Sequence, residues 1–216
     1  ICLWLAYLLR LGWRRWPWWR PAARCRWISS GQRISALSSW RVCNAAARRS
    51  EMEPAELLEL RDDLERESLR LQRLVEGLLA LQARLSISGE AVEAAALRLY
   101  SFYTGVERCL LLVSRVVNGG TPAQGEGWHR RLLERMALAT ATRPALLREV
   151  TQQQLQEYLR FRHLVRNLYA DELRPGPIAL LIDQLPPLWQ ELQHDLRHFQ
   201  TWLEAIGQLR ASHHNL

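Results

Sequence analysis

Five polar side chains between residues 162 and 169 have types that could do chemistry together. Arg162, Arg166 and Tyr169 are spaced i, i+4 and i+7, and His163 and Asn167 lie one residue further round. On a helix this spacing would project all five from neighbouring faces. Guanidinium groups suit bidentate binding of phosphate, and imidazole, amide and phenol groups transfer protons or make hydrogen bonds. The mixture therefore indicates a candidate phosphate-binding site.

The same five side chains also fit a simpler interpretation. Runs of charge on a helix are usually solvated, and the arginines would then pair with nearby acids such as Glu157 or Glu172. The apolar residues of this stretch recur at i, i+3, i+4 and i+7, which predicts that they face a core: Phe161, Leu164, Val165 and Leu168. Spacing alone leaves both interpretations of the polar residues open.

A second pair of histidines, His194 and His198, stands at i, i+4 with Asp195 between them. This spacing could hold a metal, but the HExxH pattern that would support one is missing, so we expect surface residues here. The four cysteines follow no metal-ligand or disulfide pattern, which favours a reducing cytoplasm. The sequence has no glycine-rich phosphate loop or nucleophile elbow, and we expect neither a metal nor another cofactor.

The elements that must position these residues all have the pattern of helices. Apolar residues recur at threes and fours, no segment alternates as a strand does, and proline or glycine separates the runs. The expected helices span residues 54–85, 90–117, 128–139, 142–173 and 178–209. Pro186 and Pro187 mark either a kink in the last helix or the start of a sixth. The sequence therefore predicts an all-α fold, an antiparallel bundle of five or six helices.

The first fifty residues differ from the rest in composition. They hold ten arginines, no acid and seven of the ten tryptophans, whereas the remaining 166 residues carry 19 basic and 22 acidic groups. The body is therefore mildly acidic and lacks the basic stripe of a general nucleic-acid binder. We expect residues 1–51 to be an extension outside the fold, with Met52 as the true start and 52–216 as the domain. The alternative is a tail that lies on anionic membranes, because Trp and Arg both favour the interface. A membrane-spanning helix is not expected, since the apolar run that Arg10 closes is too short to span a bilayer.

The motif resembles a known family. Arg162, four further residues and then Asn167, Leu168 and Tyr169 resemble the R-x4-H-x-Y signature of HepT-like proteins in the HEPN superfamily, and FRHLVRNLY is similar to a subgroup with the same opening. The resemblance implies a helical bundle that dimerises, with the motif of each subunit in a cleft at the dimer interface. It also implies a metal-independent ribonuclease, the toxin beside an MNT-type nucleotidyltransferase antitoxin that adenylylates the motif tyrosine, here Tyr169.

One position departs from that signature. Asn167 replaces the histidine that the family uses for proton transfer, and an amide has no titrating proton near neutral pH. His163, one helical turn earlier, is the other candidate for this role. Two functions follow: an RNA-cleaving toxin in which Arg162 and Arg166 hold the scissile phosphate, or a non-catalytic helical partner that docks the nucleotidyltransferase. Whether the protein is an enzyme is left open by the sequence, and no membrane partner is expected.

Overall fold

The computed structural model describes residues 53–122, 125, 127–169 and 172–214 of the 216-residue chain. These residues form five α-helices and one 3-10 turn: α3 (Pro54–Leu79), η1 (Gln82–Arg84), α4 (Gly89–Val116), α5 (Trp128–Met136), α6 (Glu149–Val165) and α7 (Pro175–His214). The described part contains one isolated bridge, between Thr140 and Arg143, and no strand. The all-α prediction is confirmed. The predicted extension over residues 1–51 lies outside the described residues.

Local sequence explains where the long helices begin. Pro54 occupies the first turn of α3, where its missing N–H costs nothing, and Glu56 places negative charge beside the helix N-terminus. The Ser88 side chain caps α4 by accepting a hydrogen bond from the Ala91 N–H at 3.3 Å. α3 is shorter than predicted, because the chain turns after Leu79 and continues as η1.

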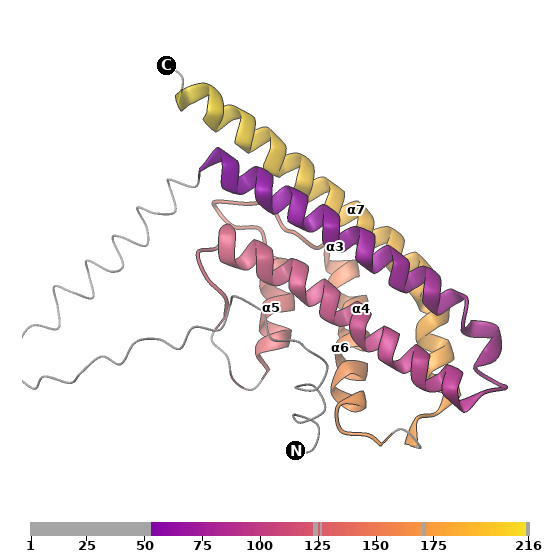
Figure 1. Cartoon of the computed structure of the whole chain (residues 1–216). Coiled ribbons are helices and arrows are strands. Elements are labelled where there is room, and N and C mark those ends of the chain that lie inside the picture. The colour runs from indigo at the N-terminus through magenta and orange to yellow at the C-terminus, as the bar shows by residue number, and fades with distance from the viewer. Residues whose placement is uncertain (1–52, 123–124, 126, 170–171, 215–216) are drawn as a thin grey trace, which may run out of the picture. The chain divides into compact units, whose positions relative to one another are not determined.

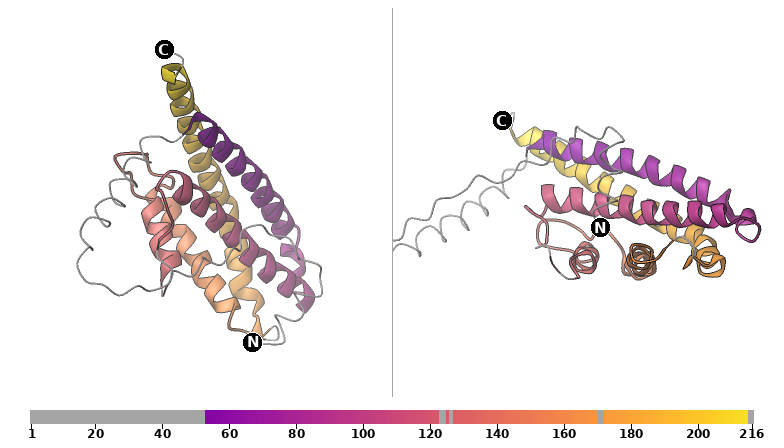
Figure 2. Two further views of the ribbon diagram at one scale, coloured as in Figure 1. Left: turned by 60° about the vertical axis from the view of Figure 1, so that its left-hand side comes forward. Right: turned by 60° about the horizontal axis from the view of Figure 1, so that its bottom comes forward.

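The helices form two groups (Figure 1). The long helices α3, α4 and α7 lie side by side, with α4 and α7 each antiparallel to α3 and packed against it. Figure 2 shows α5 and α6 end-on where α3 and α4 lie across the picture, so the two short helices cross the long ones steeply. Both short helices pack against α4. The predicted antiparallel arrangement therefore holds for the long helices, while α5 and α6 form a crossing layer.

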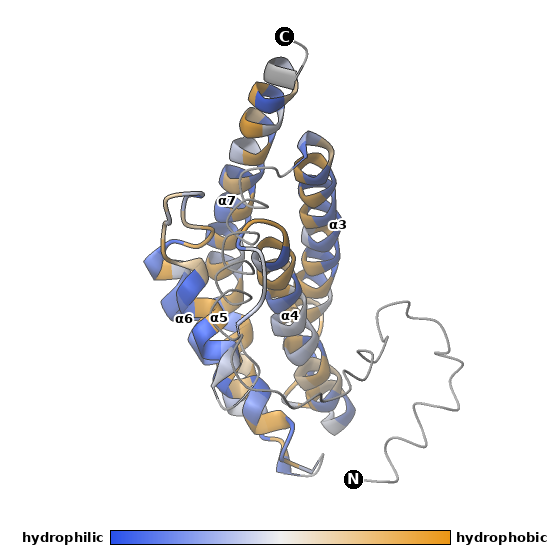
Figure 3. Cartoon of the chain, turned by 90° about the vertical axis from the view of Figure 1, so that its left-hand side faces the viewer, coloured by the Kyte–Doolittle hydropathy of each residue, from blue (hydrophilic) through white to orange (hydrophobic). Residues whose placement is uncertain are grey.

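A continuous apolar core joins the two groups. Each helix carries hydrophobic and hydrophilic residues in stripes (Figure 3), and the hydrophobic stripes supply the buried side chains. The Phe102 ring of α4 lies 5.6 Å from the Tyr158 ring of α6 and 6.4 Å from the Trp189 ring of α7. One tilted and one edge-to-face contact thus hold α4 against both α6 and α7.

α7 continues through its two prolines. Pro186 and Pro187 lie inside the helix, so no sixth helix begins there. Leu185 and Leu188 on either side are buried, and Trp189 is 7% exposed. Packing of these neighbours keeps the backbone helical although each proline removes one main-chain hydrogen bond.

The predicted helix over residues 142–173 is wrong at both ends. Residues before Glu149 are held outside the helix by Arg143, which is 3% exposed and donates hydrogen bonds to the carbonyl oxygens of Arg135, Leu138 and Pro144. Burial, reinforced by the charge of Arg135, lowers the pKa of Arg143. At the other end α6 stops at Val165, so the motif is divided between a helix and the segment after it.

Apolar periodicity failed for a related reason. Phe161 is buried as predicted, but Leu164 is 51% exposed and Leu168 only partly buried. The helix ends before Leu168, so the spacing no longer places that residue on the face of Phe161, whereas Leu164 lies inside α6 and is exposed on another face.

Candidate functional site

Three helices meet at a buried polar cluster. Glu107 of α4, His129 of α5 and Arg162 of α6 are exposed by only 6%, 8% and 8%. An Arg162 guanidinium nitrogen lies 3.4 Å from a Glu107 carboxylate oxygen, and Arg162 Nη1 lies 3.2 Å from His129 Nε2. His129 Nδ1 contacts the other oxygen of the same carboxylate. Each side chain of this Glu107–His129–Arg162 cluster therefore contacts the other two.

The contacts determine the arrangement of charge and protons. Arg162 can only donate, so His129 Nε2 accepts, and the tautomer with its proton on Nδ1 then donates to Glu107. One carboxylate and one guanidinium compensate each other, which a pair of charges at this depth requires. Arg162 Nε is buried and meets no acceptor among the described residues. The cluster thus ties α4, α5 and α6 together while one donor of Arg162 stays unused.

Aromatic rings enclose the cluster. The Tyr100 ring centroid lies 5.5 Å from the guanidinium carbon of Arg162, within range of a cation–π interaction. The Trp128 ring lies 3.9 Å from the His129 ring. Burial, with the Glu107 carboxylate nearby, raises the pKa of Tyr103, so this phenol stays protonated. Tyr100 thus covers Arg162, and Trp128 packs against His129.

His163 lies at the exposed edge of the cluster. Its ring centroid is 5.4 Å from that of His129, and the side chain is exposed, unlike that of its neighbour Arg162. Partial burial lowers the pKa of His163, and the charges of Arg162 and Arg166 and the nearby His129 lower it further, with a smaller opposing effect from Glu107. The imidazole is therefore mostly neutral at pH 7, with one nitrogen able to accept a proton.

Asn167 closes the end of α6. Its side-chain nitrogen donates to the His163 carbonyl oxygen at 3.1 Å, and its main-chain N–H donates to the Leu164 carbonyl oxygen at 3.0 Å. The Arg166 N–H donates to the Arg162 carbonyl oxygen. Carbonyls that a helix end leaves without partners are satisfied in this way. The residue at the family's histidine position thus has a structural role in this chain.

Tyr169 and Arg166 are the outward members of the motif. Tyr169 is 77% exposed, and its main-chain N–H donates to the Glu172 carboxylate at 2.8 Å. Arg166 is exposed too. Glu157 pairs with Arg160 instead of a motif arginine. The solvated-face interpretation therefore describes Arg166, while Arg162 is buried and paired within the core.

Glu107 and His129 were not foreseen from the sequence. Glu107 follows Tyr103 by four residues and precedes Leu110 by three, so it stands on the buried stripe of α4. An acid on an apolar stripe was the available signal. Nothing local connects it to His129, 22 residues further on.

The second histidine pair does not form a comparable site. His194 and His198 are exposed, while Asp195 is 4% exposed and accepts hydrogen bonds from the main-chain N–H of Arg148 at 3.0 Å and from its side-chain Nε at 2.5 Å. This carboxylate therefore holds the start of α6 against α7. Across the described residues, no group of three or more acids, histidines and cysteines is placed to share a metal ion.

The fold and cluster define an all-α protein in which a buried charge network supports an exposed polar helix end. A family model described as HepT-like protein matches residues 94–203, about half of the chain. The chain therefore belongs to the HepT-like proteins, part of the HEPN superfamily. Comparisons with curated proteins and with solved structures found no match. In the part of the chain that the structure describes, no helix combines the length and the apolar character needed to cross a bilayer.

Proposed function

We propose that this protein is a HEPN toxin that cleaves RNA in the cytoplasm without a metal, with His163 as the proton-transfer residue. One observation carries the proposal: an exposed imidazole with a lowered pKa lies within electrostatic reach of the guanidinium groups of Arg162 and Arg166. A neutral base beside fixed positive charge is the combination that cleavage of a phosphodiester needs.

The chemistry divides among the motif residues. His163 accepts the proton of a ribose 2′-hydroxyl, whose oxygen attacks the adjacent phosphorus; the 5′-oxygen leaves and takes a proton from solvent. Arg166, which is exposed, contacts the phosphate oxygens where negative charge grows. Arg162 adds its charge from within the core, and the Glu107–His129–Arg162 cluster fixes the end of α6 that carries His163.

A second copy of the chain would complete the cleft that the resemblance implies. Leu164, next to His163, is 51% exposed and would be covered in such a cleft. Light scattering of the purified protein at micromolar concentration should give about twice the monomer mass. A monomer at that concentration would remove the composite cleft.

The ribonuclease proposal is tested on bulk RNA in the presence of a chelator. We expect slow cleavage by the wild type and loss of about 10²–10⁴-fold in rate for His163→Ala, the range for removal of a positioned base. His194→Ala, which removes an exposed histidine of α7, is the matched control and should cleave normally. Asn167→His should gain nothing if His163 is the base. Faster RNA cleavage by Asn167→His, together with full activity of His163→Ala, would show that the base belongs at position 167. That result would refute the assignment of His163.

A second candidate function is docking and modification by a nucleotidyltransferase. The observation that favours it is the 77% exposure of Tyr169, just beyond the end of α6, where a partner's active site can reach the phenol. Transfer of AMP from ATP would form a phosphodiester on the phenol oxygen and release pyrophosphate. The added anion would lie near Arg166 and compete with RNA phosphate. Intact-mass spectra after co-expression with such an enzyme should show added AMP, absent in Tyr169→Phe; unchanged mass would refute this candidate.

A further inference from the structure

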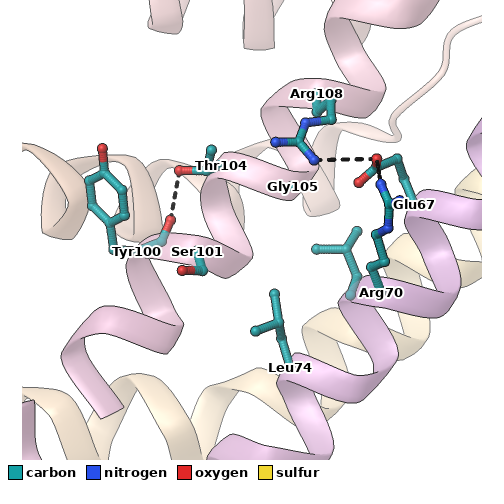
Figure 4. Close-up of a pocket in the computed structure, with 9 residues that line it drawn as sticks. Glu67, Arg70, Leu74, Tyr100, Ser101, Thr104, Gly105 and Arg108 are labelled. Atoms are coloured by element: carbon teal, nitrogen blue, oxygen red, sulfur yellow. Dashed lines mark hydrogen bonds and ion pairs between the residues drawn. The ribbon is translucent and has the colours of Figure 1, made fainter. Parts of the chain in front are cut away.

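A groove of about 230 Å³ lies between α3 and α4, apart from the motif (Figure 4). The side chains of Arg70 from α3 and Arg108 from α4 line it and converge on Glu67 (Figure 4), and Leu71 and Leu74 form its apolar wall. Its volume is below the range of about 300–1,000 Å³ typical of pockets for larger ligands. The groove can therefore hold one small group, such as a nucleoside.

Charge in the groove is positive and fixed in place. Glu67, whose side chain is 8% exposed, accepts hydrogen bonds from Arg70 Nη1 at 2.5 Å and from Arg108 Nη1 at 3.4 Å, both at the same oxygen. Glu67 is the one acid among the described residues that line the groove, so two guanidinium groups share one carboxylate. Each guanidinium group uses one nitrogen, Nη1, to bond Glu67. The other N–H groups of each arginine can then bind an anion.

Tyr100 connects this groove to the motif. It lines the groove, and its ring also lies 5.5 Å from the guanidinium carbon of Arg162. It is partly exposed, and Ser101 and Thr104 lie near it in the lining of the groove (Figure 4). Tyr100 therefore lies between the groove and the cluster that supports the end of α6.

We propose that the groove between α3 and α4 binds a nucleotide of the RNA substrate that neighbours the scissile phosphate. Arg70 and Arg108 contact its phosphate, and the base or ribose lies on Leu71 and Leu74. This inference rests on the proposed ribonuclease function. A free nucleotide presents the same phosphorylated nucleoside, so the two sources are separated by using both as probes.

The test measures binding of AMP by NMR titration and of a 2′-O-methyl RNA oligonucleotide, which cannot be cleaved, by fluorescence anisotropy. Arg108→Ala should weaken oligonucleotide binding about tenfold, the effect of one charge-assisted contact. It should also lower the slope of log affinity against log salt concentration by about 0.7, the value for one phosphate of a single strand. Arg66→Ala removes an exposed arginine of α3, one turn before Arg70 and paired with Asp63, and should change neither quantity.

The variant Glu67→Gln should change the binding affinity in the opposite direction. The amide keeps the shape and an acceptor oxygen but removes the competing negative charge, so AMP and the oligonucleotide should both bind more tightly than to the wild type. A purely structural role for the groove would give no gain, because loss of a buried carboxylate can only loosen the two arginines. Circular dichroism confirms that each variant is folded before binding is measured.

The outcomes separate this inference from the proposed function. RNA cleavage with the same KM in the wild type and Arg108→Ala would overturn the groove inference and leave the ribonuclease in place. AMP binding that depends on Arg108, in a protein that neither binds nor cleaves RNA, would overturn the RNA assignment and identify a free-nucleotide site. Weaker RNA binding in Arg108→Ala, tighter binding in Glu67→Gln and no effect in Arg66→Ala would support it.

Discussion

Arg162 and Tyr169, the two ends of the motif, differ sharply in exposure although they are only seven positions apart. Arg162 is 8% exposed and contacts Glu107 and His129, residues from two other helices. Tyr169 is 77% exposed, and its hydrogen bond runs to Glu172, three residues away. The first end of the motif is therefore part of the core, and the second end is a surface segment. Residues that read as one polar cluster in the sequence contribute to different properties, stability at one end and accessibility at the other.

His163 and Asn167 lie at the boundary between these ends. The His163 ring faces the buried His129 ring while its side chain is exposed, and Asn167 ends the helix that carries it. The exposed imidazole of His163 therefore follows directly after Arg162, a residue that the core holds in place. Such support is what a proton-transfer group needs in order to keep its position.

The comparison is tested most strongly by Arg162→Ala. Removing this guanidinium leaves the Glu107 carboxylate buried without its counter-charge, which should lower the free energy of unfolding by about 3–5 kcal/mol. Urea unfolding followed by circular dichroism measures this. The matched variant Arg166→Ala, four residues on and exposed, should change it by less than about 0.5 kcal/mol. Equal losses in the two variants would show that the division between buried and exposed ends is wrong.

A smaller effect is expected on the titration of His163. The charge of Arg166 contributes to lowering the pKa of His163 below its usual 6.5, so Arg166→Ala should raise that pKa, as measured by NMR. Between the lowered value and 6.5 the unfolded chain binds more protons, so His163 makes the fold less stable as pH falls through this window and has no such effect above it. The rate of cleavage by neutral His163 should fall as pH drops through this lowered pKa, and the fall should move to higher pH in Arg166→Ala. An unchanged pKa of His163 in this variant would show that the charge of Arg166 does not act on the site.

The smallest effect on the fold is expected for Tyr169→Phe. The hydroxyl makes no contact in the core, because the residue is 77% exposed, so the free energy of unfolding should stay within about 0.5 kcal/mol of the wild type. Thermal unfolding of both proteins checks this. A larger loss would mean that the phenol packs in the folded state, contrary to its placement at the exposed end.

Much of the fold was predictable because the sequence has clear residues that begin and end helices. α5 begins at Trp128, after Gly127, whose positive φ of 70° marks the end of a loop, and α4 ends one residue before the predicted Val117. The end of α6 was not predictable, since Leu168 continues the apolar spacing past Val165. A side-chain bond from Asn167 to a carbonyl oxygen, not periodicity, decides the boundary there.

The site was predictable only in part. Motif spacing placed Arg162 and His163 on one helix, where the structure has them, but it placed Arg166 and Tyr169 on the same helix, which ends before both. The roles of these residues stay predictions. Glu107 and His129 come from helices α4 and α5, and only tertiary packing brings them to Arg162. Pairing of this kind depends on distances between helices that a local pattern does not contain.

The two prolines of α7 bear on how the domain opens. Lacking N–H groups, Pro186 and Pro187 interrupt the hydrogen-bond ladder about one third of the way along a 40-residue helix. Before them the Leu181 carbonyl accepts a hydrogen bond from Tyr158 of α6, and after them Gln200 donates to Glu65 of α3. Amide hydrogen exchange should then detect two cooperative units in α7 that divide at the prolines, the second of them held both by the bond of Gln200 to α3 and by that of Asp195 to the start of α6. A helix that is continuous in the static structure would thus belong to two separate foldons.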